Sequence, residues 1–387
     1  MTYRWIEDIE EFRKVAEEWD DALISSENYN PFLLSDFITA WWRHFHDSRK
    51  LKIFMLCKNN QILDGMPLYL KRYGPACCKV GILNYIGGSA ANITHSLLNK
   101  NCFNLTEKLI SSLQQEEGWD FLVLNRVLAN NSLLEEIANF QITYSGKFIF
   151  KIYDGGANGI IDLTAGYENI IAGLPERLRR YLKNCKRQAS SIGKLTLQRI
   201  SGISGVAELF DEYMHLSVES FRARNAASAF EDTTYCNFFK EILAAFEKKK
   251  RLDAHRLTAG RCTLGISFGY RFGTGFKWIL TSFNPKFHRL RPGHLLLDAL
   301  VRDAINRGDR FFDMYYGGEL LYKRQWCNKM TPIKRLEICR DSYFNRGLSW
   351  ATGALKSRRK FVHLVKKAQK IINPLTPRSK DRGLLED

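Results

Sequence analysis

The chain has 387 residues, of which 45% are hydrophobic and 26% are charged, a balance that fits a folded globular protein and excludes an intrinsically disordered one. Its length suits two domains of ordinary size, and no apolar run reaches the roughly 18 residues that cross a bilayer. Lysines and arginines number 58 against 41 acidic residues, so the net charge of +17 favours an anionic partner such as a cofactor phosphate, nucleic acid or an acidic membrane surface.

The N-terminal segment and the cysteines bear on location and metal binding. Residues 1–20 are acidic and amphipathic and lack the basic start and apolar stretch of a signal peptide, so we expect a cytoplasmic protein. The nine cysteines are scattered and include no C-x-x-C pair. Neither a zinc site nor a redox motif is therefore predicted, and we expect no metal.

Residues 1–152 are expected to form a first domain of mixed helices and strands. Helices are predicted where apolar residues recur at helical spacing, and strands where apolar runs are bounded by turn residues. A weaker helix and strand are expected to complete this domain. The stronger predicted elements are, in chain order, a helix at 4–22, a helix from Ser35, strands at 51–58, 61–72 and 80–88, a helix at 105–113 and a strand at 120–124.

The segment 153–159 contains three glycines in seven residues and is the expected domain boundary. A second domain, 153–341, repeats the order of helices, a strand meander, a helix and further strands, which predicts two tandem mixed α/β (α+β) sheets flanked by helices. A basic C-terminal tail, 342–387, follows. The elements predicted in the second domain are helices at 175–193, 204–222, 232–249 and 292–306, and strands at 194–200, 251–259, 261–272, 275–283, 310–316 and 332–340.

The stretch after strand 275–283 has the composition of an anion site. Arg289 and Arg291 precede Pro292-Gly293 at the start of a helix. Proline suits the first helical turn, glycine allows a ligand to approach the backbone, and free N–H groups at a helix start attract anions. A diphosphate is the expected ligand. The same order of strand, Pro-Gly and helix also occurs in α/β proteins that bind no ligand.

This stretch resembles the acyl-CoA loop of the N-acetyltransferase (GNAT) superfamily. The likeness is greatest to the CelD-like or BioF-associated acetyltransferases, relatives of the Fem peptidyltransferases, and is specific over residues 284–326. It is carried by Asn284-Pro285-Lys286-Phe287, Arg291-Pro292-Gly293-His294-Leu295-Leu296-Leu297, Phe312-Asp313-Met314, Gly317-Gly318-Glu319 and Tyr322-Lys323-Arg324-Gln325-Trp326.

The resemblance implies two tandem GNAT-like sheets, the N-terminal one degenerate, and an N-acyltransferase that moves an acyl group from acyl-CoA, for example acetyl-CoA, to an amine. The acceptor would be an amino sugar, a cell-envelope or polysaccharide precursor, or another glycan- or lipid-linked amine. Two alternatives stay open. One is a Fem-like transferase that uses aminoacyl-tRNA, the single case in which a nucleic acid partner is expected. The other is a catalytically inactive GNAT-fold scaffold in exopolysaccharide assembly.

The resemblance also implies roles for individual residues. The strand that contains Thr281 and Ser282 would bind the pantetheine arm through its backbone. The residues that would cradle the diphosphate are Arg289, Arg291, Gly293, His294 and Leu295. The candidates for proton transfer and acceptor binding are Asp313, Tyr316, Glu319 and Lys323.

Simpler interpretations stand beside these roles. Asp313 could bind a nearby backbone N–H, and Glu319 with Lys323 has the i, i+4 spacing of a helix salt bridge. Three positions depart from the family pattern: Arg291 replaces a serine, Leu295 replaces a small residue, and Gly318 replaces an acid.

Two basic helices suggest anionic partners. The helix at 177–187 would contact an anionic acceptor or present a solvated face. The tail contains an amphipathic basic helix that would lie on an anionic membrane surface, which would make the protein peripheral to the inner membrane, or would dock on its own domain.

Overall fold

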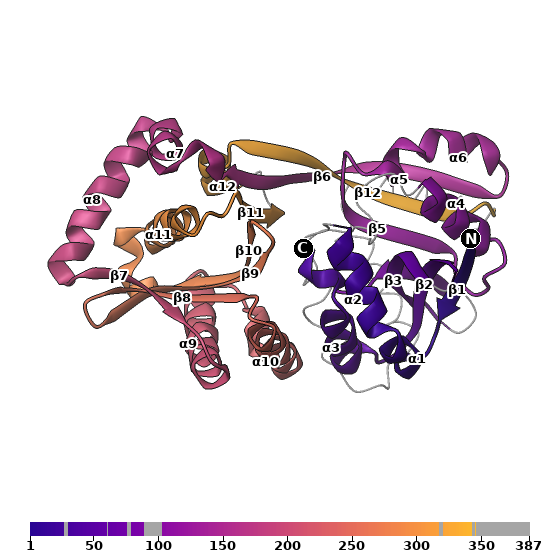
Figure 1. Ribbon diagram of the computed structural model, residues 1–387, viewed down its shortest axis with the longest axis horizontal. Coiled ribbons are helices and arrows are strands. Elements are labelled where there is room, and N and C mark those ends of the chain that lie inside the picture. The colour runs from indigo at the N-terminus through magenta and orange to yellow at the C-terminus, as the bar shows by residue number, and fades with distance from the viewer. Residues whose placement is uncertain are drawn as a thin grey trace. The chain divides into compact units, whose positions relative to one another are not determined.

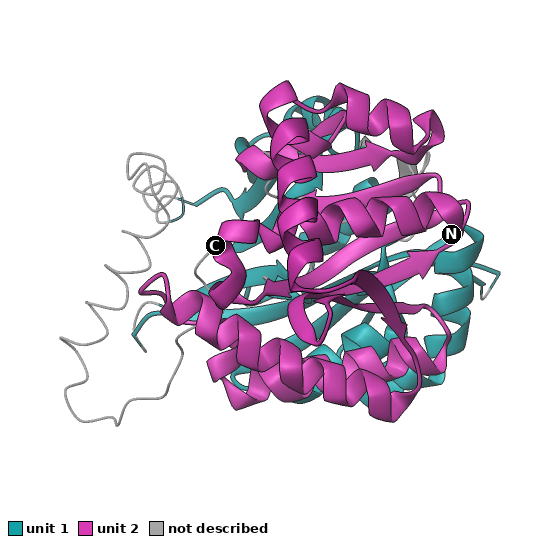
Figure 2. Ribbon diagram, turned by 90° about the vertical axis from the view of Figure 1, so that its left-hand side faces the viewer, with its two compact units in different colours: residues 1–155, 333–387 teal, residues 156–332 magenta. Residues whose placement is uncertain are grey.

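The computed structural model describes residues 1–26, 30–59, 61–75, 79–88, 103–316, 320–342 and 345. The chain divides into two compact units, shown in Figure 2: unit 1 is residues 1–155 with 333–387, and unit 2 is residues 156–332. Each unit contains a mixed sheet with helices packed against it, which confirms the predicted α/β class. The helix expected in the tail lies outside the described residues.

Unit 1 has a sheet with one parallel strand pair. Its strands, in spatial order, are β1 (Thr2–Ile6), β2 (Arg49–Lys58), β3 (Gln61–Tyr73), β4 (Val80–Tyr85), β5 (Phe121–Leu128) and the second part of β12 (Lys329–Arg340). Neighbouring strands are antiparallel except β4 and β5, which are parallel. The helices are α1 (Ile9–Lys14), α2 (Ala16–Ser25), α3 (Ser35–Phe45), α4 (Phe103–Leu113), α5 (Ser132–Glu135) and α6 (Ile137–Thr143).

Unit 2 repeats this pattern (Figure 1). Its strands, in spatial order, are β7 (Leu195–Ile200), β8 (Leu252–Ala259), β9 (Cys262–Phe272), β10 (Gly275–Phe283), β11 (Phe311–Tyr316) and the second part of β6 (Phe148–Asp162). Here β10 and β11 form the parallel pair, and the other pairs are antiparallel. The same strand order in both units is the tandem arrangement that the sequence predicts.

The outermost strand of each repeat comes from the other half of the sequence. Strand β6 follows β5 in the chain, yet its residues 158–162 pair with β11 of unit 2. Strand β12 follows β11, yet its residues 333–339 pair with β5 of unit 1. The strand predicted at 332–340 was expected to belong to the second domain, but it pairs with β5 of unit 1. The prediction was wrong because an apolar pattern identifies a strand but not its partner.

The two units divide between residues 155 and 156, inside the glycine-rich segment 153–159 that was expected to be the domain boundary, and this segment lies within strand β6. Its glycines serve close packing. A Cβ atom at Gly159 would lie 2.6 Å from Cys327 Sγ, and one at Gly155 would lie 3.2 Å from the Ile333 side chain. A segment with small side chains can therefore remain extended where a neighbouring segment leaves no room for larger ones.

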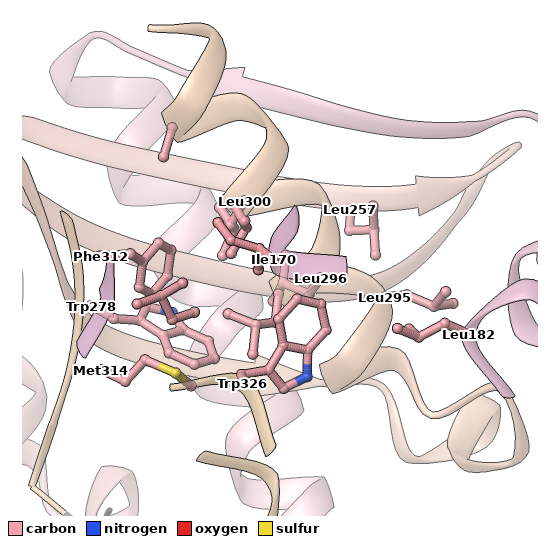
Figure 3. Packing of buried hydrophobic residues seen from close by; sticks show 14 of the residues in the cluster. Ile170, Leu182, Leu257, Trp278, Leu295, Leu296, Leu300, Phe312, Met314 and Trp326 are labelled. Carbon is pink, nitrogen blue, oxygen red and sulfur yellow. The ribbon is translucent and has the colours of Figure 1, made fainter. Parts of the chain in front are cut away.

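Helices cover both faces of the unit 2 sheet (Figure 1). Helices α9 (Ile203–Arg222) and α10 (Thr233–Lys248) pack on the face that carries Phe268 and Tyr270. On the other face, α8 (Glu176–Ile192) and α11 (Pro292–Asn306) enclose an apolar cluster (Figure 3). Helix α7 (Tyr167–Gly173) joins them, and a salt bridge of 2.7 Å between Lys186 Nζ and Asp298 Oδ2 fixes α8 to α11.

Replacing Leu296 by alanine tests this core. Leu296 is fully buried, so its loss should lower the free energy of unfolding by about 2–5 kcal/mol. Leu321→Ala is the matched control, because Leu321 is 73% exposed and its truncation should change stability by less than about 0.5 kcal/mol. Urea unfolding measures both, and equal effects of the two changes would contradict the assigned core.

Candidate active site

The parallel strands β10 and β11 separate after three residue pairs. They pair from Gly275 with Phe311 to Lys277 with Asp313, and no pair beyond these joins them in the described part of the chain. Each strand has a bulge close to this point, between Trp278 and Leu280 in β10 and after Asp313 in β11. Beyond Lys277, the edge of β10 that faces β11 therefore has backbone N–H and C=O groups that β11 does not pair with. An extended ligand can bind these groups.

Helix α11 begins directly after β10 and a 3-10 turn, η5 (Pro285–Leu290). Arg291 has the left-handed backbone conformation (φ 49°), Pro292 is the first helical residue, and no side chain caps the helix. An added Cβ atom at Gly293 would meet only Phe283, at 3.5 Å, which is ordinary contact distance. The fold therefore does not require glycine here. The N–H groups of His294 and Leu295 donate to the Arg291 carbonyl (3.0 and 3.4 Å), which leaves the Gly293 N–H and the helix dipole for an anion that lies close to the backbone.

Tyr181 of α8 holds the predicted diphosphate loop. Its hydroxyl donates a hydrogen bond to the carbonyl oxygen of Arg289 (3.1 Å) and accepts one from Arg291 Nε (3.3 Å). The Arg291 guanidinium also lies 5.6 Å from the centre of the Tyr181 ring. Both arginines are exposed. The structure thus brings the two predicted arginines together with the start of α11, next to the basic helix α8.

The remaining predicted cofactor-binding residues are Thr281, Ser282, His294 and Leu295. Thr281 Oγ1 donates to the carbonyl of Ile266 on β9 (3.4 Å), and the Ser282 side chain is buried. The Leu295 side chain lies in the apolar cluster, on the same side as Leu182 in Figure 3. The Ser282 and Leu295 side chains are buried, so only the main chain of these two residues remains to contact a ligand. His294 is half-buried in the first turn of α11.

Asp313 holds the bulge in β11. Its Oδ1 accepts hydrogen bonds from the backbone N–H of Tyr315 (2.8 Å) and from Asn158 Nδ2 (3.2 Å), and its Oδ2 accepts one from Lys277 Nζ (3.1 Å). Tyr315 has a positive φ of 59°, a backbone conformation that costs energy for a residue with a side chain. Burial raises the pKa of the Tyr315 phenol well above its usual value, so it stays neutral.

Lys323 supports the same bulge from helix α12 (Leu321–Trp326). Its ammonium group is buried and donates to the carbonyl oxygens of Met314 (2.5 Å) and Tyr315 (3.4 Å). We call residues Asp313–Tyr315 the β11 bulge. Two residues predicted to transfer protons or bind the acceptor, Asp313 and Lys323, are thus engaged with the backbone of this bulge. Glu319 and the Tyr316 side chain lie outside the described residues.

Sequence reasoning missed Lys277, Asn158 and Tyr181. Lys277 carried a signal, because a lysine in the middle of an apolar strand needs an acidic partner when it is buried. Asn158 gave none, because its segment was considered only as a domain boundary. Tyr181 belongs to the basic helix expected at 177–187, and helical spacing alone does not show that it contacts the loop before α11. In the described part of the chain, no group of three His, Cys, Asp or Glu side chains could hold a metal ion, and no helix is long and apolar enough to cross a membrane.

The family model described as "Acetyltransferase (GNAT) domain" matches residues 176–324, a range that begins with α8 and contains η5, α11 and the β11 bulge. Over residues 176–324 the chain is therefore similar to GNAT acetyltransferase domains. This finding supports an acyltransferase in general terms and, through the family, an acyl-CoA co-substrate. No curated protein sequence matches the chain significantly.

Several solved structures have a similar fold. A crystal structure of FemX has a TM-score of 0.58 at 11% identity, and the alignment covers 87% of this chain and 97% of the FemX chain. The C-terminal domain (DUF2156) of a putative lysylphosphatidylglycerol synthetase from Agrobacterium fabrum has a TM-score of 0.51 at 12% identity, with coverages of 89% and 96%. L-PGS from Bacillus licheniformis has a TM-score of 0.51 at 11% identity, with coverages of 83% and 90%. At these identities the likeness shows the fold alone.

Replacing Lys323 by methionine tests its contact with the β11 bulge. The change leaves the Met314 and Tyr315 carbonyls without this donor, so the free energy of unfolding should fall by about 1–3 kcal/mol. Arg324→Met is the control, since Arg324 is exposed and its loss should change stability by less than about 0.5 kcal/mol. Chemical unfolding of both variants gives the comparison. A Lys323→Met protein as stable as the control would show that Lys323 does not support the bulge.

Proposed function

We propose that this protein is an N-acyltransferase that moves an acyl group from acyl-CoA to an amine. The observation that carries the proposal is the separation of β10 from β11 immediately before an uncapped helix start. A strand edge with available backbone groups and an adjacent anion site match the two polar parts of acyl-CoA, the amide-containing pantetheine arm and the diphosphate.

The roles of individual residues follow from this placement. The backbone of Thr281 and Ser282 would bind the pantetheine amides, because their side chains are tied to the fold. The side chains of Arg289 and Arg291 and the N–H group of Gly293 would hold the diphosphate, with Leu295 contributing only its place in the first turn, because its N–H donates to the Arg291 carbonyl (3.4 Å). Gly293 leaves room for phosphate oxygens close to the helix axis.

The reaction is attack of a neutral amine on the thioester carbon. A C–N bond forms, the C–S bond breaks through a tetrahedral oxyanion, the amine loses a proton and the leaving thiolate gains one. The β11 bulge would shape the wall beside the reacting carbonyl, with Asp313 and Lys323 as its supports. Tyr316 and Glu319 are the proposed groups for proton transfer. Catalysis would draw mainly on positioning of the two substrates.

We further propose that the acceptor is an amino sugar or a glycan- or lipid-linked amine of the cell envelope, as the resemblance to CelD-like acetyltransferases implies. An aminoacyl-tRNA donor is the second candidate. It is favoured by one observation, a basic stripe along the exposed face of α8. The stripe consists of Arg179, Arg180, Lys183 and Arg187, all exposed.

Calorimetric titration with acetyl-CoA and longer acyl-CoAs tests the donor. The protein should bind at least one acyl-CoA at micromolar concentration, and Gly293→Trp should abolish binding by filling the space beside the first turn. Gly173→Trp is the matched control, because a Cβ atom at Gly173 meets nothing within 4 Å. It should bind like the unchanged protein.

The remaining outcomes distinguish the alternatives. Binding of aminoacyl-tRNA without acyl-CoA binding would replace the leading donor with the second one. A folded protein that binds neither donor would contradict both and would leave an inactive GNAT-fold scaffold as the interpretation.

A further inference from the structure

We propose that Trp326 holds His294 as a neutral imidazole with its proton on Nε2, and that this Nε2–H donates a hydrogen bond to the anion bound at the start of α11. Trp326 is then a positioning residue, and His294 is a fixed donor and not a base. The inference deepens the proposed function and rests on it for the identity of the anion.

The first step is the contact between the two rings. Trp326 Nε1 lies 3.1 Å from His294 Nδ1. An indole nitrogen can only donate, so His294 Nδ1 has to accept and cannot carry a proton. The proton of the neutral ring is therefore on Nε2, because a neutral imidazole has one donor and one acceptor nitrogen.

The second step is the charge of the ring. Burial and the neighbouring Arg291 guanidinium both lower the pKa of His294. The first turn of a helix also disfavours a cation, because the helix dipole is positive at that end. The indole donor adds a third obstacle, since a protonated Nδ1 would face the Trp326 N–H. Each of these contacts favours the neutral ring.

The third step is direction. Side chains of a helix tilt toward its N-terminus, so a residue in the first turn leans toward the start of the helix. His294 is the third residue of α11, two positions after Pro292. Its one ring N–H can therefore join the backbone N–H of Gly293 in binding a phosphate oxygen.

The position of Trp326 is itself fixed. It is 2% exposed within the apolar cluster that also contains Met314 and Leu296 (Figure 3). Three residues earlier on α12, Lys323 donates to the carbonyls of the β11 bulge. Helix α12 thus contacts both the start of α11, through Trp326, and the β11 bulge, through Lys323. It would hold the anion site and the bulge at a fixed distance from each other.

The test compares two tryptophans of the same cluster. Trp326→Phe keeps an aromatic ring but removes the donor to His294, whereas Trp278→Phe removes the donor to Ser267 Oγ (2.7 Å). The two variants should lose similar stability. Only Trp326→Phe should weaken CoA binding by several-fold in calorimetry, because only it frees the His294 ring. Equal weakening by both variants would reduce Trp326 to a packing residue and overturn the proposal.

A second pair of variants examines the donor itself. His294→Ala should weaken CoA binding by about tenfold, the effect of losing one hydrogen bond to a charged group. His294→Gln should restore most of the affinity, because its amide N–H can replace Nε2–H without a charge. A glutamine variant as weak as the alanine variant would contradict a neutral donor.

Nuclear magnetic resonance gives a readout that does not depend on binding. In ¹⁵N-labelled protein, a scalar coupling across the hydrogen bond should join Trp326 Nε1 to His294 Nδ1, and its absence from the folded protein would refute the contact. Inorganic pyrophosphate separates this inference from the proposed function. Suppose that pyrophosphate binds, that its affinity depends on His294, and that no form of CoA binds. The role of His294 as a hydrogen-bond donor to an anion is then supported, and acyl-CoA as the donor substrate is contradicted. If neither binds, both fall.

Discussion

The candidate site depends on two strands that run parallel for three residue pairs and then part. Leaving a strand edge unpaired in the middle of a sheet is costly, because backbone groups lose their partners. Here the separation is built into the chain by the β11 bulge, whose Tyr315 adopts a positive φ. The Asp313 carboxylate and the Lys323 ammonium offset that strain by bonding the backbone on either side. Strain of this kind persists only where the surroundings hold it in place.

The anion site next to the bulge follows from a different principle. Helix α11 starts without a side-chain cap, so its dipole and the Gly293 N–H are available to a ligand. The loop before it is held by one tyrosine from α8, through both its hydroxyl and its ring. A sheet edge and a helix start are thus brought together by short connections, and neither depends on a long flexible loop.

Local features of this fold could be predicted from the sequence. The helix at 292–306 was expected from Pro292-Gly293 and its apolar spacing, and α11 spans the same residues. The meander of β8, β9 and β10 was expected from its turn glycines and is present.

Features set by distant partners could not be predicted in this way. The glycines of 153–159 indicate a domain boundary when they are considered alone, but nothing in them shows that they lie in a strand, β6, where they provide room for Cys327 and Ile333. The sequence marks Asp313 and Lys323 as polar residues near a site, yet their partners are backbone atoms of a bulge that no spacing rule reveals. The Trp326 to His294 contact likewise joins residues 32 positions apart.

The exchange of outer strands has a consequence for how the chain is made. Strand β5 ends at Leu128, but its neighbour β12 begins only at Lys329, about 200 residues later. During synthesis, the edge of β5 therefore stays unpaired until almost the whole chain has been made. Open edges are sites of wrong pairing, and pairs so distant in sequence form slowly. The newly made N-terminal half is thus expected to be the part of this protein most dependent on chaperones and most easily lost to aggregation when the chain is truncated.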